Sequence, residues 1–345
     1  MSRRLKLLVA LTVLVALAIP VAATVLRAQV LAPLAIPTEG IVFEVREGSS
    51  LTRVATILKR EGVLSSARLF RIVGRFTGAD QRIRRGEYRL RAGQSMMDVL
   101  DQLQSGATIR YLVTLPEGIR LAQALELLRS TEGIRSVLAG IDDPRLKGFT
   151  GDAPGAEGLF LPETYQYERG DTDLDVLTQA HDLLENTLAQ VWQQREVGLP
   201  YESPYAALIM ASIIEKETGV PEERAQIAGV FVRRLNRDMR LQTDPTVIYG
   251  LGESFDGNLT RAHLRDESNE YNTYRRDGLP PTPIALAGRA ALEAAVHPAP
   301  GDALYFVARG DGTHEFNATL AEHEDAVRRY QLQRRESYRS TVERN

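Results

Sequence analysis

Residues 201–219 read YESPYAALIMASIIEKETG, and this stretch predicts a buried helix that ends in acidic residues. Ser203 is suited to the N-cap and Pro204 to the first helical position, while Gly219 fits the left-handed position that ends many helices. The interior, residues 206–214, is apolar on nearly every side, as in helices inside a protein core. We therefore expect a globular domain built around this helix.

Two glutamates, Glu215 and Glu217, flank Lys216 near the end of the predicted helix. Side chains two positions apart on a helix point about 200° apart, so the two carboxyl groups cannot share one small site. A carboxyl group that emerges from an apolar helix loses hydration, which raises its pKa toward the range of a general acid. The alternative is that both are surface glutamates, and helical geometry alone does not choose between these interpretations.

The composition is that of a globular protein with room for two domains. The 345 residues are 43% hydrophobic and 25% charged, with a net charge of −3. This balance argues against intrinsic disorder and against a protein that wraps nucleic acid. The sequence has no cysteine, which excludes disulfides, thiolate catalysis, cysteine-ligated zinc and iron–sulfur clusters.

The N-terminus contains an uncharged run, LLVALTVLVALAIPVAATVL, at residues 7–26. As a helix this run spans about 30 Å, the thickness of a bilayer core. The basic residues before it outnumber the single Arg27 after it, which places the N-terminus in the cytoplasm. A cleaved signal peptide is the alternative, but its apolar run is shorter. We expect a single-pass inner-membrane protein: cytoplasmic residues 1–6, an anchor at 7–27, a linker at 28–40 and a periplasmic remainder.

A small strand–turn–helix pattern follows the linker and then recurs. Residues 41–64 alternate like a strand, turn at Gly48, and continue as a helix capped by Ser49 or Ser50 with apolar positions 51, 54, 55 and 58. Residues 86–106 repeat the pattern, and residues 112–128 echo it more weakly. These units resemble LysM modules, which bind glycans that contain N-acetylglucosamine. The alternative is a spacer in which strands simply pack on helices.

The predicted fold class is therefore α+β. It comprises an N-terminal transmembrane helix, a small LysM-like module of βααβ type at residues 41–108, and a larger mixed α+β catalytic domain at residues 109–345.

Five motifs in order resemble the MltG (YceG-like) endolytic murein transglycosylases. They are EGLFLPETYQY (157–167), ASIIEKETG (211–219), LQTDPTVIYG (241–250), YNTYRRDGLPPTPI (271–284) and YFVARGDGTHEFNATLAEH (305–323). The resemblance extends from the anchor to about residue 330. It implies a lyase that cleaves the β-1,4 bond between N-acetylmuramic acid and N-acetylglucosamine inside a glycan strand and leaves a 1,6-anhydro end.

The resemblance maps the catalytic acid onto Glu215, the first glutamate of EKE. One carboxyl group suffices for such a lyase, because the sugar's own 6-hydroxyl captures the oxocarbenium-like centre and returns its proton to the glutamate. Ordinary glycoside hydrolysis needs a second carboxylate. Glu157 and Glu163 are the strongest candidates for that group, and structural hydrogen bonding is the alternative for each.

Further candidates for substrate binding are polar or aromatic residues in the same motifs. Beside Glu157 and Glu163 they are Gln242, Asp244, Tyr271, Asn272, Tyr274, His314 and Asn317. Core packing is the alternative for the tyrosines, and Thr243 or Asp244 is also expected to cap a short helix that ends at Gly250. The spacing of His314 and His323 matches no compact zinc pattern, so we expect neither metal nor cofactor.

Three other functions compete with the transglycosylase. A muramidase would use water in the same cleft, and an inactive anchored glycan-binding protein would organise cell-wall synthesis. A pyridoxal-phosphate lyase needs a Schiff-base lysine, for which Lys216 is the sole candidate. The expected partners are peptidoglycan glycan strands, the cytoplasmic membrane and, as the family implies, peptidoglycan synthases beside which the enzyme ends strand elongation.

Overall fold

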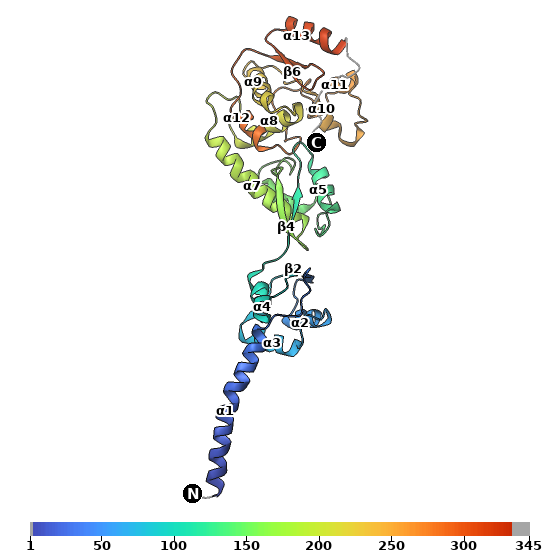
Figure 1. The fold of residues 1–345 in the computed structure, drawn as a ribbon. Helices are drawn as coiled ribbons and strands as arrows, with labels where there is room; N and C mark the ends of the chain where they lie inside the picture. Colours follow the sequence, from blue (N-terminus) through green and yellow to red (C-terminus); the bar gives the residue numbers. More distant parts are fainter. Residues whose placement is uncertain (1–2, 333–345) are drawn as a thin grey trace. The chain divides into compact units, whose positions relative to one another are not determined.

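The computed structural model describes residues 3–332, which form two compact units. One unit contains Met1–Tyr111 and Glu168–Gly170, and the other contains Leu112–Tyr167 and Asp171–Asn345. Both combine helices with short strands that pair two by two (Figure 1). The predicted α+β class is confirmed. Residues 1–2 of the expected cytoplasmic segment and residues 333–345 of the expected catalytic domain lie outside the described residues.

The small unit begins with the long helix α1 (Arg3–Leu31). Its part Thr12–Leu31 is long and apolar enough to cross a membrane, by length and composition. Val30, in the last turn, and Ile36 are buried in the core of the small unit. Residues 28–40, expected as a linker, therefore pack against this unit.

The rest of the small unit alternates strands and helices. Its elements are β1 (Ile41–Val45), α2 (Leu51–Arg60), α3 (Ala67–Phe76), β2 (Gly86–Leu90) and α4 (Met96–Ser105). Strands β1 and β2 pair antiparallel. The expected apolar stripes of α2 and α4 are buried, and the Ser50 hydroxyl caps α2, so these local predictions are confirmed. The LysM-like character of the unit stays a prediction.

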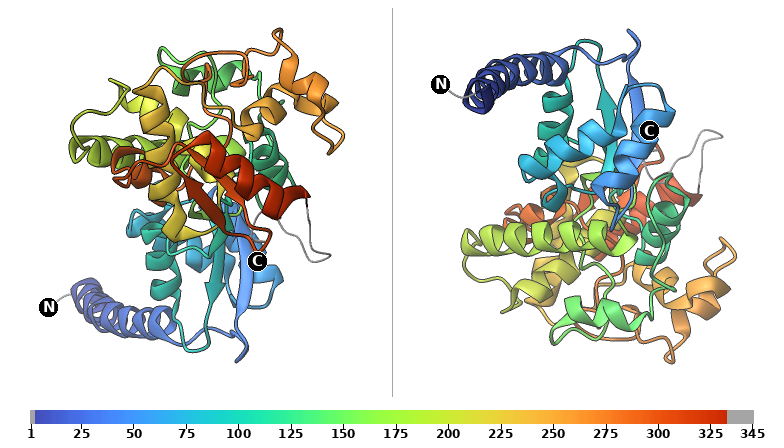
Figure 2. Two further views of the ribbon diagram at one scale, coloured as in Figure 1. Left: turned by 90° about the horizontal axis from the view of Figure 1, so that it is seen from above. Right: turned by 90° about the horizontal axis from the view of Figure 1, so that it is seen from below.

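The large unit is mostly helical. In chain order it contains β3 (Arg110–Thr114, whose first two residues lie in the small unit), α5 (Leu121–Ser130), α6 (Lys147–Thr150), β4 (Thr164–Glu168, whose last residue lies in the small unit), α7 (Asp173–Gln193), α8 (Pro204–Glu217), α9 (Arg224–Leu235), α10 (Asp244–Leu251), α11 (Arg261–Arg265), α12 (Arg289–Val296), β5 (Tyr305–Ala308), β6 (His314–Asn317) and α13 (Leu320–Val327). Strand β3 pairs with β4, and β5 pairs antiparallel with β6. Helix α8 packs against α7, α9, α10 and α12, and Figure 2 shows these helices gathered around it.

Helix α8 is the predicted buried helix. The Ser203 hydroxyl accepts the Ala206 N–H at 3.1 Å, and Pro204 is the first helical residue, as expected. Every residue from Ala207 to Glu215 is buried. The prediction for Gly219 is wrong: Thr218 leaves the helix in an extended conformation, so no left-handed glycine is needed there.

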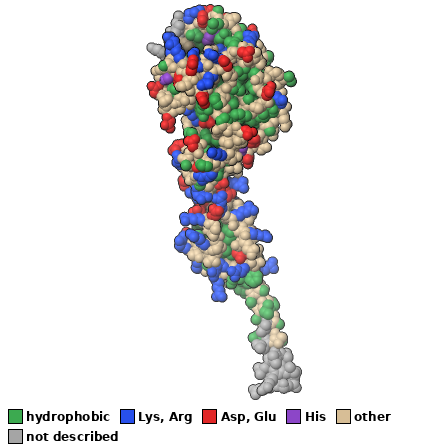
Figure 3. Space-filling model, turned by 180° about the vertical axis from the view of Figure 1, so that it is seen from behind, with side chains coloured by type: hydrophobic (Ala, Val, Ile, Leu, Met, Phe, Trp, Pro, Cys, Tyr) green, Lys and Arg blue, Asp and Glu red, His purple; other side chains and the backbone are tan. Residues whose placement is uncertain are grey.

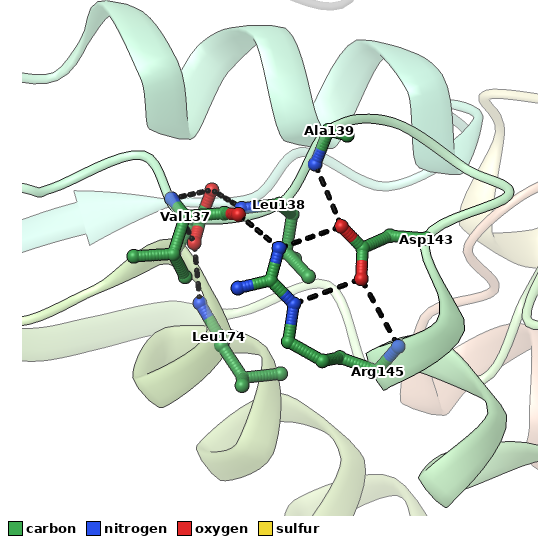
Figure 4. A network of polar contacts seen from close by, with 7 residues as sticks. Val137, Leu138, Ala139, Asp143, Arg145 and Leu174 are labelled. Carbon is green, nitrogen blue, oxygen red and sulfur yellow. Dashed lines mark hydrogen bonds and ion pairs between the residues drawn. The ribbon is translucent and has the colours of Figure 1, made fainter.

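A polar network fastens the loop between α5 and α6 to the start of α7 (Figure 4). Asp143 accepts the Ala139 N–H at 2.9 Å and binds Arg145 through two nitrogens, and these bonds hold the pKa of Asp143 well below its usual range. Asp173 accepts the N–H groups of Val137 and Leu138. The loop thus gains partners for backbone donors that no helix or strand satisfies.

Candidate active site

A cavity of about 680 Å³ opens beside the C-terminal end of α8. Side chains from α8, α9, α10, β5, β6 and α13 and from the loops between them line it. Its polar lining comprises Lys216, Glu217, Arg234, Gln242, Thr243, Asp244, Tyr274, Tyr305, His314, His323 and Gln331. The cavity therefore joins the last turn of the buried helix to three of the recognised motifs.

Glu217 is the glutamate of α8 that faces this cavity. Its half-buried carboxyl group accepts a hydrogen bond from the Thr243 hydroxyl. Burial raises the pKa of Glu217 to about 7, with a further contribution from the negative charge of Asp244, while the Thr243 bond opposes the shift. A carboxyl group with this pKa can donate a proton near neutral pH.

Glu215 occupies a different environment, on the core side of α8. Its side chain is 0% exposed, and it accepts the Gly288 N–H at 3.2 Å. Its other oxygen lies 3.9 Å from a guanidinium nitrogen of Arg224. Glu215 does not line the cavity. The expected divergence of the two glutamates is thus present, and Glu215, the expected acid, is the one enclosed by protein.

Thr243 is the N-cap residue of α10 by position, but its side chain does not cap the helix. The hydroxyl binds Glu217 instead, so the expected capping role is wrong for Thr243. Asp244 is the first helical residue, and the helix runs to Leu251, one residue past the expected end.

Asp244 and Tyr274 form a hydrogen-bonded pair in the cavity wall. The Tyr274 hydroxyl donates to Asp244 at 2.7 Å, and burial together with the Asp244 charge raises the pKa of Tyr274. The phenol therefore stays protonated at neutral pH. Asp244 itself is exposed, so a second carboxylate borders the cavity that holds Glu217.

Gln242 has an unusual backbone conformation, with φ at 54° in the left-handed region. Its N–H donates to the Thr273 carbonyl at 3.2 Å, and its side-chain oxygen accepts a bond from Arg234 at 3.0 Å. Arg234 also donates to the Leu241 carbonyl at 2.6 Å. Non-glycine residues rarely keep this conformation unless surrounding contacts impose it. Arg234 is one such contact, because its guanidinium group binds both the Gln242 side-chain oxygen and the Leu241 carbonyl.

His314 borders the cavity from β6 and is held by Glu223. The His314 N–H donates to Glu223 Oε1 at 2.7 Å, and its Nδ1 lies 2.8 Å from Glu223 Oε2. Farther along, the His323 ring stacks on Tyr305 with centroids 5.2 Å apart. Burial lowers the pKa of His323, so its imidazole is neutral at neutral pH.

The chain matches known proteins over most of its length. Residues 43–329 match the YceG-like family. The chain belongs to that family. It is 35% identical over 301 residues to the endolytic murein transglycosylase of Bacillus subtilis (strain 168), covering 82% of each chain. The endolytic murein transglycosylase of Streptococcus pneumoniae (strain D39) is 26% identical, over 76% of this chain and 53% of that protein.

A solved structure also resembles this YceG-like chain. It is the crystal structure of a putative yceG-like protein from Listeria monocytogenes, with 29% identity and a TM-score of 0.53, covering 84% of this chain and 99% of that one. The family resemblance predicted from the five motifs is confirmed.

Four of the expected substrate-binding residues of this YceG-like chain line the cavity: Gln242, Asp244, Tyr274 and His314. Asn272 does not, because its side chain is fully buried and donates to the carbonyls of His263, Leu264 and Asp266. Its observed role is to hold the loop in shape.

The remaining expected residues have other partners. Glu157 accepts the Leu121 N–H at 2.9 Å, and burial raises its pKa. Glu163 is exposed and accepts the N–H of its neighbour Thr164. The Tyr271 hydroxyl bonds that of Thr282, and Asn317 pairs with β5. None of these four lines the cavity, so the structure does not bring them together with Glu217.

Sequence reasoning missed Glu217 as the cavity-facing carboxyl group, and it missed Arg234. The signal for Arg234 was its place in GVFVRRL, residues 229–235, which is apolar apart from its two arginines. Such a run predicts that one of the two arginines points inward. No local signal separated Glu217 from Glu215, because both lie on a helix that is apolar all round.

Proposed function

We propose that this chain is a membrane-anchored endolytic murein transglycosylase. It cleaves the β-1,4 bond between N-acetylmuramic acid and N-acetylglucosamine within a glycan strand and leaves a 1,6-anhydro-muramic end. Two observations support this: membership of the YceG-like family with relatives that bear this name, and a glutamate with pKa about 7 in a cavity of about 680 Å³.

The single observation that carries the mechanism is the placement of Glu217. A lytic transglycosylase needs a neutral carboxylic acid to protonate the glycosidic oxygen, and the same group as a carboxylate then takes the proton of the sugar's 6-hydroxyl. Glu217 meets both needs, because its pKa of about 7 allows both forms near neutral pH and it faces the cavity. We assign the acid–base role to Glu217 in place of Glu215.

Glu215 then has a structural role. Its carboxylate joins α8 to the N–H of Gly288, directly before α12, and lies near Arg224 of α9. A group with a side chain that is 0% exposed cannot reach a glycan unless α8 moves.

The other cavity residues supply binding. Gln242 offers amide N–H donors to a sugar N-acetyl carbonyl, while Asp244, Tyr274 and His314 offer bonds to hydroxyl groups. Glycan strands outside the cytoplasm are the substrate if α1 is a single-pass anchor with a cytoplasmic N-terminus. On this proposal the enzyme cuts nascent strands close to the membrane, beside peptidoglycan synthases, and so ends strand elongation.

A hydrolytic muramidase is the second candidate, and Asp244 favours it. Hydrolysis requires a second carboxylate to activate water, and Asp244 borders the same cavity as Glu217, whereas Glu157 and Glu163 do not. Asp244 already accepts a hydrogen bond from the Tyr274 hydroxyl at 2.7 Å, which occupies one of its carboxylate oxygens and supports the intramolecular route.

The test is mass spectrometry of peptidoglycan treated with the full-length enzyme and with two matched variants. Anhydro-ended internal fragments, one water lighter than hydrolysis products, would support the transglycosylase; reducing ends would establish the muramidase. We expect Glu217→Gln to abolish cleavage and Glu215→Gln to retain it. The reverse result would restore Glu215 as the acid, and no cleavage by folded wild-type enzyme would favour a glycan-binding function.

A further inference from the structure

The small unit, which continues directly from α1, carries a concentration of positive charge. Residues 41–111 contain thirteen Lys and Arg against seven Asp and Glu, whereas the whole chain has a net charge of −3. Figure 3 shows the Lys and Arg side chains spread over the surface of this unit. The proposed catalytic function makes no use of this charge.

One helix of the unit combines this charge with exposed apolar side chains. Helix α3 contains three arginines and no acidic residue. Its outward residues follow a helical spacing of three and four, and we call them the α3 stripe: Arg68, Arg71, Ile72, Arg75 and Phe76. Phe76 is 88% exposed and Ile72 is 44% exposed. The opposite side of α3 is buried through Phe70 and Gly74, so the helix is fixed with this stripe outward.

The acidic groups near the α3 stripe neutralise little of its positive charge. Asp80 lies 3.9 Å from Arg75, whose side chain is 85% exposed, and such an open pair is weak. Helix α2, which packs on α3, ends in the basic residues Lys59 and Arg60, with Glu61 3.5 Å from Arg60. The surface around the stripe thus stays basic.

The attachment of α1 fixes how far this unit can lie from the end of the apolar helix. Val30 is buried in the core of the unit, and the Leu34 N–H bonds the Gln94 carbonyl at 2.8 Å. The candidate span ends at Leu31, so no free linker separates it from the unit. Figure 1 shows α3 at the end of the unit from which α1 leaves.

We infer that the α3 stripe docks on the anionic phospholipid surface of the membrane that α1 crosses. The guanidinium groups match lipid phosphates, and Phe76 and Ile72 enter the interface between headgroups and acyl chains. This inference rests on the proposed membrane anchor and is independent of the cavity chemistry. It gives the 88% exposed Phe76 and the neighbouring Ile72 an apolar environment.

The experiment uses the full-length chain in vesicles of phosphatidylcholine, with or without phosphatidylglycerol. Trp192 is the single tryptophan, so Trp192→Phe with Phe76→Trp leaves one fluorescent reporter on the stripe. Lipids brominated in the acyl chain should quench this reporter in the anionic vesicles. Replacing Arg68, Arg71 and Arg75 by Gln should lower the ratio of docked to undocked protein on the order of 100-fold, whereas Lys at the three positions should preserve most docking.

A matched control reporter is Val42→Trp on β1, at a side chain 44% exposed like Ile72, which should not be quenched. Alkaline extraction followed by flotation tests the anchor separately. A chain that floats but whose Phe76→Trp reporter stays accessible to aqueous quencher would overturn the docking alone. A chain released by alkali would overturn both anchor and docking. Release of the reporter from vesicles by soluble glycan fragments would overturn lipid docking in favour of glycan binding by the module.

Discussion

The Thr243 hydroxyl donates its hydrogen bond to Glu217, although Thr243 stands at the N-cap position of α10. This bond stabilises the ionised carboxylate and lowers its pKa against the larger effect of burial. Thr243→Val should therefore raise the pKa of Glu217 further. We expect the alkaline limb of the pH profile of kcat/KM to move to higher pH.

The matched control for that variant is Thr246→Val. Thr246 bonds the Thr243 carbonyl and the Thr273 hydroxyl, and it does not touch Glu217. It should lower stability without moving the limb. An equal shift in both variants would mean that the limb reports general loosening of the loop and not the Glu217 bond.

The wild-type enzyme should lose activity as pH rises through about 7. The proton donor must be neutral before reaction, and Glu217 becomes ionised across this range because its pKa is raised to about 7. The measurement is the initial rate of anhydro-end formation from pH 5 to 9 at fixed ionic strength. A rate that is level to pH 9 would contradict the assignment of Glu217 as the acid.

Glu217→Gln should stabilise the protein at high pH while it removes activity. The folded pKa of about 7 lies above the ordinary value of 4.5, so the folded state binds the proton more tightly and stability falls as pH rises through this window. Above pH 7 the ionised carboxylate destabilises the fold. Allowing for partial exposure, we expect the variant to gain about 1 kcal/mol in the free energy of unfolding at pH 8 and nothing below pH 4.5.

Glu215→Gln should have the opposite effect on stability. The amide can still accept the Gly288 N–H, but the variant removes one of the two carboxylates near Arg224. The other, Glu117 at 3.7 Å, remains. We expect a loss of about 1–3 kcal/mol by urea unfolding at pH 8, with glycan cleavage retained in the folded fraction. A variant as stable as wild type but inactive would contradict this structural role.

Asn272→Ala should reduce stability more than it affects substrate binding. The Asn272 amide satisfies three backbone carbonyls, and its oxygen accepts the Tyr274 N–H at 3.0 Å. Loss of these buried bonds should lower the free energy of unfolding by about 2–3 kcal/mol in urea titrations. Unchanged stability with a raised KM would instead support the substrate contact that the motif alone suggested.

Local features were predictable from the sequence because short-range physics determines them. The stripe of α2 with its Ser50 cap, the stripe of α4, and Ser203 and Pro204 at the start of α8 all follow from helical period and capping chemistry. The YceG-like family was recognisable for a related reason, because its motifs are contiguous in the chain.

The chain sequence by itself therefore determined an apolar N-terminal helix, a mixed α+β fold, the buried helix α8 and the presence of two diverging glutamates at its end. Only the tertiary structure decided which glutamate faces the cavity. Helix α8 is apolar all round, so both faces look alike in sequence. The difference arises when α12 and Arg224 cover Glu215, while Thr243 and Asp244, distant in the chain, meet Glu217. Burial and charge at a carboxyl group depend on such long-range contacts, and no local pattern encodes them.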